Sequence, residues 1–269
     1  DFDKDGDVDI VAGSFDYTGT YPNIVYEHVH LFRNNGKGTL TRSVLNMSST
    51  PPNWGAISPA MADLDTDGDL DLLLGSYYDN SLLYYRQEAN GTFSEQLEEW
   101  DPVTKNGNPF SDFETGANAA PAFIDFNKDG HLDLFVADEE GYYGYKYSDN
   151  IINYYTNKGN STFEEVEGFE NPFDGVFVKR FGSPVIMDID GDQELDALIG
   201  NKYTTSEWDY DSGSYIYTYS QVAYYKKEEN VYTRAEETND PFKDLQIDGY
   251  FSPSFPRVDG DGDEDIFSG

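Results

Sequence analysis

Short apolar runs separated by turn residues dominate the hydrophobic pattern of the chain. Gly, Asn, Asp and Pro interrupt it roughly every 8 to 15 residues, a spacing typical of strands joined by tight turns. No apolar stripe continues at helical spacing, so few or no helices are predicted. Four runs have the composition of buried strands, and each opens on an aspartate: residues 9–13, 71–75, 133–137 and 196–200. The pattern therefore predicts an all-β fold.

The predicted strands belong to a repeated unit. Five acidic motifs mark it, and their last aspartates are separated by 62, 62, 63 and 69 residues: Asp9, Asp71, Asp133, Asp196 and Asp265. A proline stands four residues before the last four of these motifs: Pro59, Pro121, Pro184 and Pro253. In each unit we expect a strand that contains the proline, the acidic loop, the apolar strand, an aromatic strand, a Gly/Asn turn and an outer strand.

Units of about four strands at a fixed period predict a β-propeller, because each thin blade must pack on its neighbours to bury its faces. A β-solenoid is the alternative, although its repeats are usually shorter. The markers give four full periods and a partial one, so residues 1–269 form one propeller domain or a fragment of one. Because the chain opens within a motif, we expect a mature or cropped piece of a longer protein, whose remainder would be one of its partners.

The acidic motif has the spacing of a cation-binding loop. It reads D-x-D-x-D-G-x-x-D, with carboxylates at positions 1, 3, 5 and 9, a glycine for the sharp turn at position 6 and a backbone carbonyl at position 7. Oxygen ligands in this number favour Ca²⁺ over Mg²⁺ and zinc. An EF-hand is excluded, since position 12 is an apolar residue within a predicted strand and not a glutamate before a helix. A single acidic run is usually solvated surface, but four phased copies favour a bound cation.

Four loops are predicted to hold calcium. Their ligands are Asp1, Asp3, Asp5 and Asp9; Asp63, Asp65, Asp67 and Asp71; Asp125, Asn127, Asp129 and Asp133; and Asp188, Asp190, Asp192 and Asp196. Loop four has Gln193 at the glycine position, and because a left-handed glutamine costs on the order of 1 kcal/mol we expect its shape to differ. In a weaker fifth loop Arg257 replaces the first ligand, and we expect its guanidinium to take the place of an ion among Asp259, Asp261 and Asp265.

About four ions are predicted, and their role is structural. Extracellular calcium modules bind at roughly 10⁻⁴ to 10⁻³ M, so at millimolar calcium and the tight end of that range each filled site would add about 1.4 kcal/mol. The four sites together would approach the stability of an ordinary domain. Cytosolic calcium is too dilute to fill sites of this strength. We therefore expect the protein to work outside the cell, at its surface or in a calcium-rich lumen.

Composition narrows the choice of partners. The formal net charge of −35 disfavours nucleic acid and anionic membranes, which would repel the chain, and favours cations. Aromatic residues make up 16% of the chain, too many for a disordered acidic tail. Cysteine is absent, which excludes disulfides and thiolate metal sites. No apolar run is long enough to insert into a membrane, and the acidity would also suit a salt-adapted organism.

The units resemble a known family. The segment SPAMADLDTDGDLDLLLG from Ser58, and the hairpin pattern LFRNNGKGTL from Leu31, look like FG-GAP/VCBS repeats, the calcium-loop blades of integrin α-subunit propellers and of many secreted propeller proteins. The resemblance spans essentially the whole chain. It implies calcium loops that join the first two strands of each blade, and propellers that often have seven blades. It does not imply a particular ligand, because function depends on sites added to the fold.

Catalytic residue types are scarce in the chain. Its histidines are His28 and His30, which share one face of a predicted strand, and His131 at position 7 of the third loop. Ordinary packing is the simpler explanation for the first two, and position 7 uses its backbone as ligand. Calcium ligation accounts for most paired carboxylates without glycoside hydrolysis. We therefore assign no catalytic residue.

Aromatic and glycan-acceptor positions suggest a binding surface. Aromatic side chains on loops suit sugar stacking or a protein partner, although packing between blades is the simpler role for any single one. The candidates are Tyr142, Tyr143, Tyr145 and Trp208. Three sequons would accept N-glycans in an exported eukaryotic protein, although Asn-Gly-Thr is also ordinary turn chemistry: Asn46, Asn90 and Asn160.

These observations favour an extracellular, calcium-stabilised propeller that binds a protein or a glycan in adhesion or in a surface assembly. The alternative is an enzyme that acts on polysaccharide, in which the propeller is the catalytic body or an accessory domain. Binding tests with and without a chelator, and turnover of candidate polysaccharides, separate the two.

Overall fold

The computed structural model describes residues 1–20, 23–49, 57–76, 81–139, 152–174, 176, 183–209, 214–228, 231–236, 238–245, 253–254 and 266–268. Of these, residues 14–20, 23–28, 76, 117, 139, 201–209, 214–221 and 267–268 are described by their backbone alone. The described part is almost entirely strand, and its helical structure is the short 3₁₀ turn η1 (Gly168–Glu170). Within these residues no helix has the length and apolar character needed to cross a bilayer.

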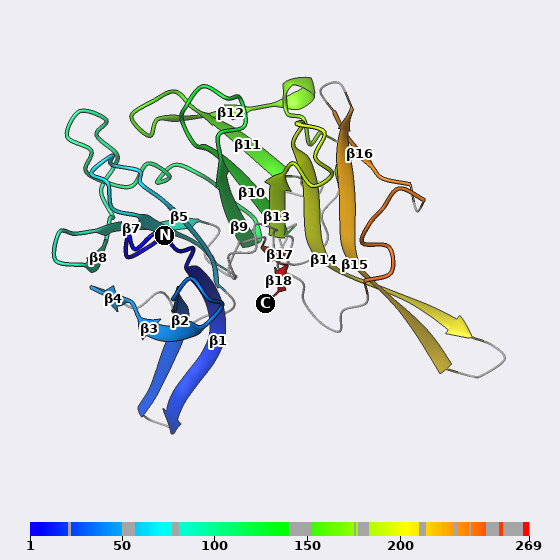
Figure 1. Ribbon diagram of the computed structural model, residues 1–269, viewed down its shortest axis with the longest axis horizontal. Coiled ribbons are helices and arrows are strands. Elements are labelled where there is room, and N and C mark those ends of the chain that lie inside the picture. The colour runs from blue at the N-terminus through cyan, green and yellow to red at the C-terminus, as the bar shows by residue number, and fades with distance from the viewer. Residues whose placement is uncertain are drawn as a thin grey trace.

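Antiparallel sheets follow one another along the chain as the blades of a propeller (Figure 1). Blade one consists of β1 (Ile10–Thr20), β2 (Asn23–Asn34) and β3 (Leu40–Val44). Blade two consists of β5 (Ile57–Ala62), β6 (Asp71–Ser76), β7 (Leu82–Gln87) and β8 (Thr92–Glu95). A short strand from the preceding linker, β4 (Asn46–Met47), pairs in parallel with β8 at the outer edge of blade two.

The later blades repeat the same meander. Blade three consists of β9 (Ala117–Ile124), β10 (Asp133–Glu139), β11 (Ile152–Asn157) and β12 (Phe163–Val166). Blade four consists of β13 (Ser183–Met187), β14 (Asp196–Asp209), β15 (Ser214–Glu228) and β16 (Val231–Arg234). A two-stranded pair follows, β17 (Pro253–Ser254) with β18 (Phe267–Ser268). The predicted all-β propeller built of four-stranded repeats is confirmed.

In blades two to four the first strand of the meander is the innermost, and β1 to β3 of blade one correspond in register to the second to fourth strands of those blades. Consecutive inner strands β5, β9, β13 and β17 contact one another, and β1 of blade one contacts β5. Figure 1 shows β9 and β13 towards the middle of the molecule, with β12 and β16 towards the outside. Close packing at the centre requires glycine. A Cβ on Gly13 would lie 1.6 Å from the carbonyl oxygen of Ile57, and one on Gly75 would lie 1.9 Å from that of Ala119.

The hydrophobic core lies between blades. Alternate residues of a strand point to opposite faces, so one strand of blade two serves two interfaces. Leu72 and Leu74 pack with Leu31 of blade one, whereas Leu73 packs with Leu134 of blade three. Blades three and four meet in the same way through a cluster that contains stacked aromatic rings. A repeated strand pattern that is apolar on both faces is thus explained by burial between neighbours.

Two hairpins are much longer than the repeat requires. β1 and β2 pair out to Thr20 and Asn23, and β14 and β15 pair out to Asp209 and Ser214. Both pairings shift register directly after a glycine, which is Gly13 in β1 and Gly200 in β14. Figure 1 shows the two hairpins as arms that extend away from the blades. The repeat pattern alone did not predict this extension.

Candidate metal-binding loops

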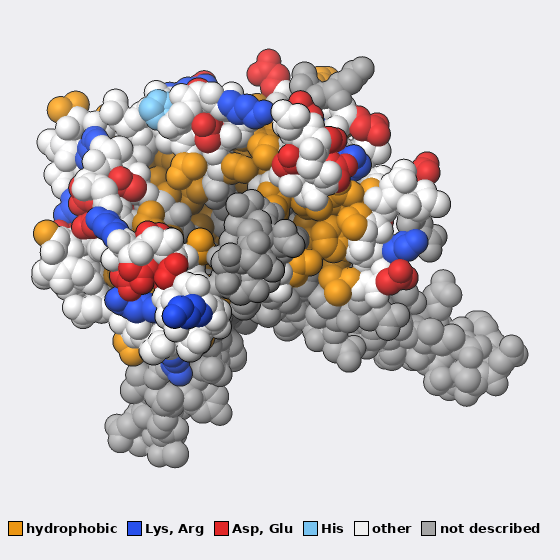
Figure 2. Space-filling model, viewed as in Figure 1, with side chains coloured by type: hydrophobic (Ala, Val, Ile, Leu, Met, Phe, Trp, Pro, Cys, Tyr) orange, Lys and Arg blue, Asp and Glu red, His pale blue; other side chains and the backbone are white. Residues whose placement is uncertain are grey.

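Each acidic loop occupies the same place in its blade. Residues 63–70 connect β5 to β6, residues 125–132 connect β9 to β10, and residues 188–195 connect β13 to β14, while residues 1–9 lead directly into β1. The family resemblance implied this position, between the first and second strands of a blade. On the face shown in Figure 2, acidic side chains gather in separate groups with basic side chains beside them.

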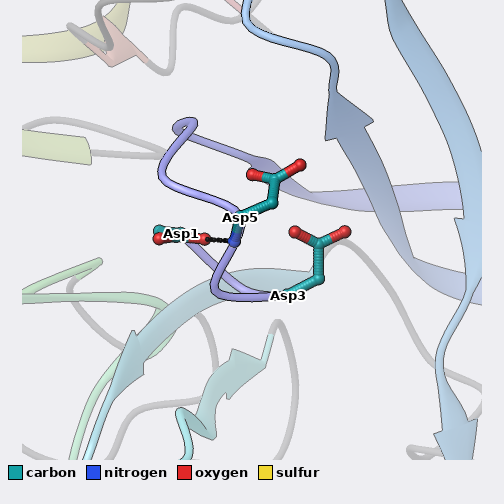
Figure 3. A group of neighbouring side chains, drawn as sticks. All are labelled: Asp1, Asp3 and Asp5. Carbon is teal, nitrogen blue, oxygen red and sulfur yellow. Dashed lines mark hydrogen bonds between the residues drawn. The ribbon is translucent and has the colours of Figure 1, made fainter.

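Hydrogen bonds from the backbone hold the acidic side chains inside each loop. The carboxylate at position 1 accepts a bond from the amide at position 6, at 3.0 Å in all four loops. The carboxylate at position 5 accepts a bond from the amide at position 7, at 2.8–3.0 Å. In loop one the amide of Asp5 also donates to Asp1, and the side chains of Asp1, Asp3 and Asp5 lie together (Figure 3).

Loop four keeps the backbone shape that the other loops have. Position 6 is left-handed throughout, with φ of +98°, +91° and +91° at three glycines and +74° at Gln193. Position 4 is also left-handed, and there loop four carries glycine, Gly191, where loop one carries Lys4. Loop four differs in a hydrogen bond in which the amide of Gly191 donates to Asp188. A glycine at position 4 therefore accompanies the glutamine at position 6.

In three of the loops, carboxylate oxygens lie close enough together for one cation per loop to bind them. In each group the oxygens lie within 4.8 Å of one another: Asp1, Asp3 and Asp5; Asp63, Asp65 and Asp67; Asp188, Asp190 and Asp196. Calcium–oxygen bonds of 2.3–2.6 Å place ligands of one ion no more than about 5 Å apart. Loop three has the same turn but offers the amide oxygen of Asn127 at position 3, which accepts a bond from the amide of Asp129. Hard oxygen donors at these separations fit Ca²⁺.

Two carboxylate oxygens in these groups are buried without a hydrogen-bond partner. They are Oδ1 of Asp63 in loop two and Oδ1 of Asp196 in loop four. Asp196 is only 1% exposed, and its other oxygen accepts bonds from the amide of Ile189 and the hydroxyl of Tyr224. A buried carboxylate oxygen without a partner is costly unless a cation or a donor satisfies it. Both atoms are positions at which a bound cation would supply the partner.

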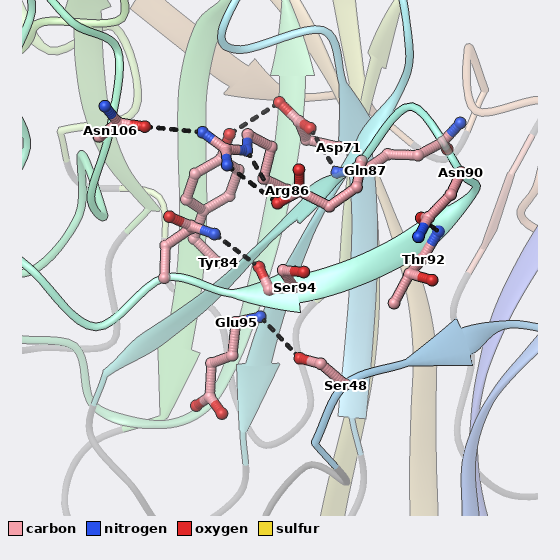
Figure 4. A network of polar contacts seen from close by, with 12 residues as sticks. Ser48, Asp71, Tyr84, Arg86, Gln87, Asn90, Thr92, Ser94, Glu95 and Asn106 are labelled. Atoms are coloured by element: carbon pink, nitrogen blue, oxygen red, sulfur yellow. Dashed lines mark hydrogen bonds and ion pairs between the residues drawn. The ribbon is translucent and has the colours of Figure 1, made fainter.

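The aspartate at position 9 ties each loop to the third strand of its blade. Asp71 is fully buried and accepts bonds from the amides of Leu64 and Gln87 and from the hydroxyl of Tyr84 (Figure 4). Asp133 likewise accepts a bond from the Tyr154 hydroxyl at 3.1 Å. These tyrosines were not among the predicted site residues. Their signal was present in the first tyrosine of YYRQ, YYTN and YYKK, which recurs at one position of the repeat.

Burial controls the electrostatics of these inner carboxylates. It raises the pKa of Asp71 to about 7, although hydrogen bonds from Gln87 and Tyr84 act in the opposite direction. Burial also raises the pKa of Asp133 and of Asp196. A divalent ion beside these groups would favour their charged forms. At the exposed end of loop three, by contrast, the hydrogen bond from the His131 amide lowers the pKa of Asp129.

Basic side chains already contact several loops. Lys4 of loop one forms an ion pair with Asp69 of loop two at 2.6 Å. Lys105 donates to the backbone oxygen of Asp65 at 2.8 Å and to the hydroxyl of Thr66. These contacts connect neighbouring loops, and they use groups outside the three clustered carboxylates. Loops one and two are therefore linked to each other through Lys4, and Lys105 ties loop two to the segment that follows β8.

The remaining predicted residues are scattered. His30 is buried with its ring 6.3 Å from that of Phe32, and His131 is exposed. Asn90 and Asn160 are exposed at equivalent hairpin turns, whereas the side chain of Asn46 donates to the Thr92 hydroxyl. Trp208 lies in β14 and is described by its backbone alone. Outside the described residues are Tyr142, Tyr143, Tyr145, Arg257, Asp259, Asp261 and Asp265.

Comparison with protein families gives a match over most of the chain. A model described as FG-GAP-like repeat matches residues 1–74, 63–136 and 125–199, and these segments overlap at the acidic loops. The chain belongs to the FG-GAP-like repeat family. The matched segments run from one loop through the next, so the family unit and the repeat read from the sequence have the same period.

Beyond its family, this FG-GAP-like repeat protein has only weak similarity to the known proteins described below. A search of curated proteins finds no match. Among solved structures, the chain is similar to a lectin of Agrocybe aegerita described as recognising non-reducing terminal N-acetylglucosamine. The two share 15% sequence identity with a TM-score of 0.43, over 90% of this chain and 55% of the lectin chain. The chain thus spans about half the length of that lectin.

Proposed function

We propose that the protein is a calcium-stabilised propeller module that works outside the cell and binds a protein or glycan ligand. About four Ca²⁺ ions occupy loops one to four, with ligands at positions 1, 3, 5 and 9. Their role is to join blades that have no disulfides to hold them. Calcium at the millimolar level of extracellular fluids suits loops of this exposed, carboxylate-rich type.

The observation that carries the calcium assignment is the Asp196 carboxylate. Its Oδ1 atom is buried without a hydrogen-bond partner, and the residue belongs to a group whose oxygens from Asp188 and Asp190 lie within the span of one calcium shell. Asp63 in loop two repeats the feature with its own unpartnered Oδ1. A cation in each of the two loops would satisfy the unpartnered atom there and offset the repulsion among that loop's clustered carboxylates.

Calorimetric titration of the calcium-free protein tests the assignment. We expect about four calcium equivalents to bind, more tightly than magnesium does. Asp67→Ala removes a ligand of loop two and should lower the number of bound ions by one. Asp112→Ala makes the same charge change at an exposed site outside the loops and should leave the number unchanged. A wild-type protein that takes up no calcium would exclude the assignment.

Two features support the extracellular and ligand-binding part of the proposal. Asn90 and Asn160 stand at exposed hairpin turns, where glycans could be attached without disturbing the blades. The β14–β15 hairpin, which carries Trp208, extends away from the blades and could contact a partner (Figure 1). Tyr142, Tyr143 and Tyr145 remain candidate contacts for the same ligand.

A glycan array and a pull-down from extracellular matrix proteins test ligand binding, each with and without a chelator. We expect binding that is lost when calcium is removed, because the ions hold the blades that present the surface. Trp208→Ala should weaken binding without changing the number of calcium ions. Turnover of a polysaccharide by the purified protein would instead favour the enzyme alternative.

A further inference from the structure

One position on the third strand of each blade faces the acidic loop, and we call it the loop-facing position. It follows directly after the residue that pairs with the first residue behind the loop, as in the pairs Ile10 with Phe32 and Ala197 with Tyr225. The equivalent residues in blades one to four are Arg33, Arg86, Thr156 and Lys226. Three of the four are cations.

Two of these cations contact carboxylates that are proposed calcium ligands. In blade one, Nη1 of Arg33 lies 2.9 Å from Oδ2 of Asp3. In blade four, Nζ of Lys226 bonds to Asp190 and lies 3.6 Å from Oδ2 of Asp192. Lys226 thus forms ion pairs with the carboxylates at positions 3 and 5 together, as a bound cation would.

Arg86 in blade two occupies the same position but pairs outside its loop. Its hydrogen bonds go to Glu88 and Asn106 (Figure 4). Its ion pair is with Glu88, at 2.9 Å. The direct contact between the facing cation and a proposed ligand is therefore described for blades one and four.

Blade three differs at both ends of this contact. Position 3 of its loop is the neutral Asn127, and the loop-facing residue is the neutral Thr156, whose hydroxyl donates to the backbone of Glu164. Within the described part of the chain, no lysine or arginine forms an ion pair with a ligand of loop three. A loop with four carboxylates has a facing cation, and the loop with three has none. The net charge of ligands plus facing residue is thus the same in all four blades.

We propose that the loop-facing residue sets how tightly its loop holds calcium, and that Lys226 competes with the ion for Asp190 and Asp192 in loop four. This inference rests on the proposed calcium function. A tethered ammonium stabilises the calcium-free loop by relieving repulsion among its carboxylates. The same charge opposes a divalent ion at the same carboxylates. One side chain therefore affects the two states of the loop in opposite directions.

Substitution of Lys226 tests the proposal by two readouts. Lys226→Met keeps most of the stem and removes the charge. Removing a unit charge about 5 Å from a divalent ion in a water-like dielectric should tighten the binding of one calcium equivalent about tenfold. The same variant should unfold at a lower temperature than wild type in a chelator. If it does not fold, Lys226→Thr introduces the residue that blade three carries at this position.

Lys227→Met is the matched control. Lys227 is the next residue on the same strand, and its ion pair is with Glu194 at position 7, which offers only its backbone to the ion. We expect it to change calcium affinity by less than about twofold. Thr156→Lys is the converse variant, and it should weaken the binding of one calcium equivalent about tenfold.

The outcomes separate the inference from the proposed function. Tighter calcium binding together with a less stable calcium-free protein, found for Lys226→Met and not for Lys227→Met, supports the inference. Calcium binding by wild type that responds equally to both substitutions, or to neither, overturns the inference and leaves the proposed function intact. A wild-type protein that binds no calcium overturns both.

Discussion

Blades one and two differ in how they satisfy the carboxylate at the ninth position of the loop. Asp9 and Asp71 each accept bonds from the backbone amide at position 2 of the loop and from one amide of the third strand. Asp71 also accepts a bond from Tyr84, whereas the equivalent residue in blade one is the buried Leu31. Asp71 is fully buried, and Asp9 is partly exposed.

The difference shows what the tyrosine contributes. A buried carboxylate needs a donor for each acceptor site that water would otherwise fill. Blade two supplies a third donor from the phenol and excludes water, and blade three does the same with Tyr154. In blade four Tyr224 also donates to Asp196, whose other oxygen is buried without a hydrogen-bond partner. Blade one fills that space with an apolar side chain and leaves its carboxylate in contact with solvent.

The largest predicted effect is the loss of the buried carboxylate in blade two. Asp71→Asn leaves one oxygen to accept bonds from three donors, and it should lower the free energy of unfolding by about 3 kcal/mol. Asp9→Asn should cost about 1 kcal/mol, because water can replace the lost bond at the partly exposed site. Urea unfolding in the presence of a chelator measures both without a contribution from calcium. Equal costs would contradict the comparison.

A smaller effect is predicted for the tyrosine hydroxyl. Tyr84→Phe removes a hydrogen bond to a charged group and should cost about 2 kcal/mol, again by urea unfolding. Tyr85→Phe is the control, since the neighbouring side chain points to the opposite face and packs in another cluster. Combining Asp71→Asn with Tyr84→Phe should cost less than the sum of the single changes, because both remove the same bond. Strict additivity would show that the bond contributes nothing.

The smallest effect concerns position 6 of loop four, where a glutamine stands in place of the glycine of the other loops. Gln193 holds φ at +74°, so Gln193→Gly should stabilise the protein by about 1 kcal/mol through relief of left-handed strain. Gln193→Ala removes the same side chain but keeps the strain, and should give no gain. A thermal shift that is equal for the two variants would mean that the backbone conformation carries no cost.

Much of the fold could be predicted from the sequence because the repeat makes each local signal count several times. The apolar runs 71–75 and 133–137 became the buried second strands β6 and β10, and the loops before them took one common shape. The regular spacing of these signals reflects a physical need, since every blade must present the same two faces to its neighbours.

Features that depend on contacts across strands could not be predicted. Nothing adjacent in sequence links Tyr84 to Asp71 or Lys226 to Asp190; the pairing register brings them together. Gln193 was expected to alter the shape of its loop. Positions 4 and 6 are both left-handed, however, and loop four has its glycine, Gly191, at position 4 instead of position 6. The long hairpins were missed because their polar and aromatic sequences lack the repeat signal.

Thermal unfolding with and without a calcium chelator tests the central claim most directly. If about four ions each contribute about 1.4 kcal/mol at millimolar calcium, chelation should lower the Tm by about 10 °C or more. Restoring calcium, but not the same concentration of magnesium, should bring the Tm back. A Tm that is the same in millimolar calcium and in chelator would contradict the account.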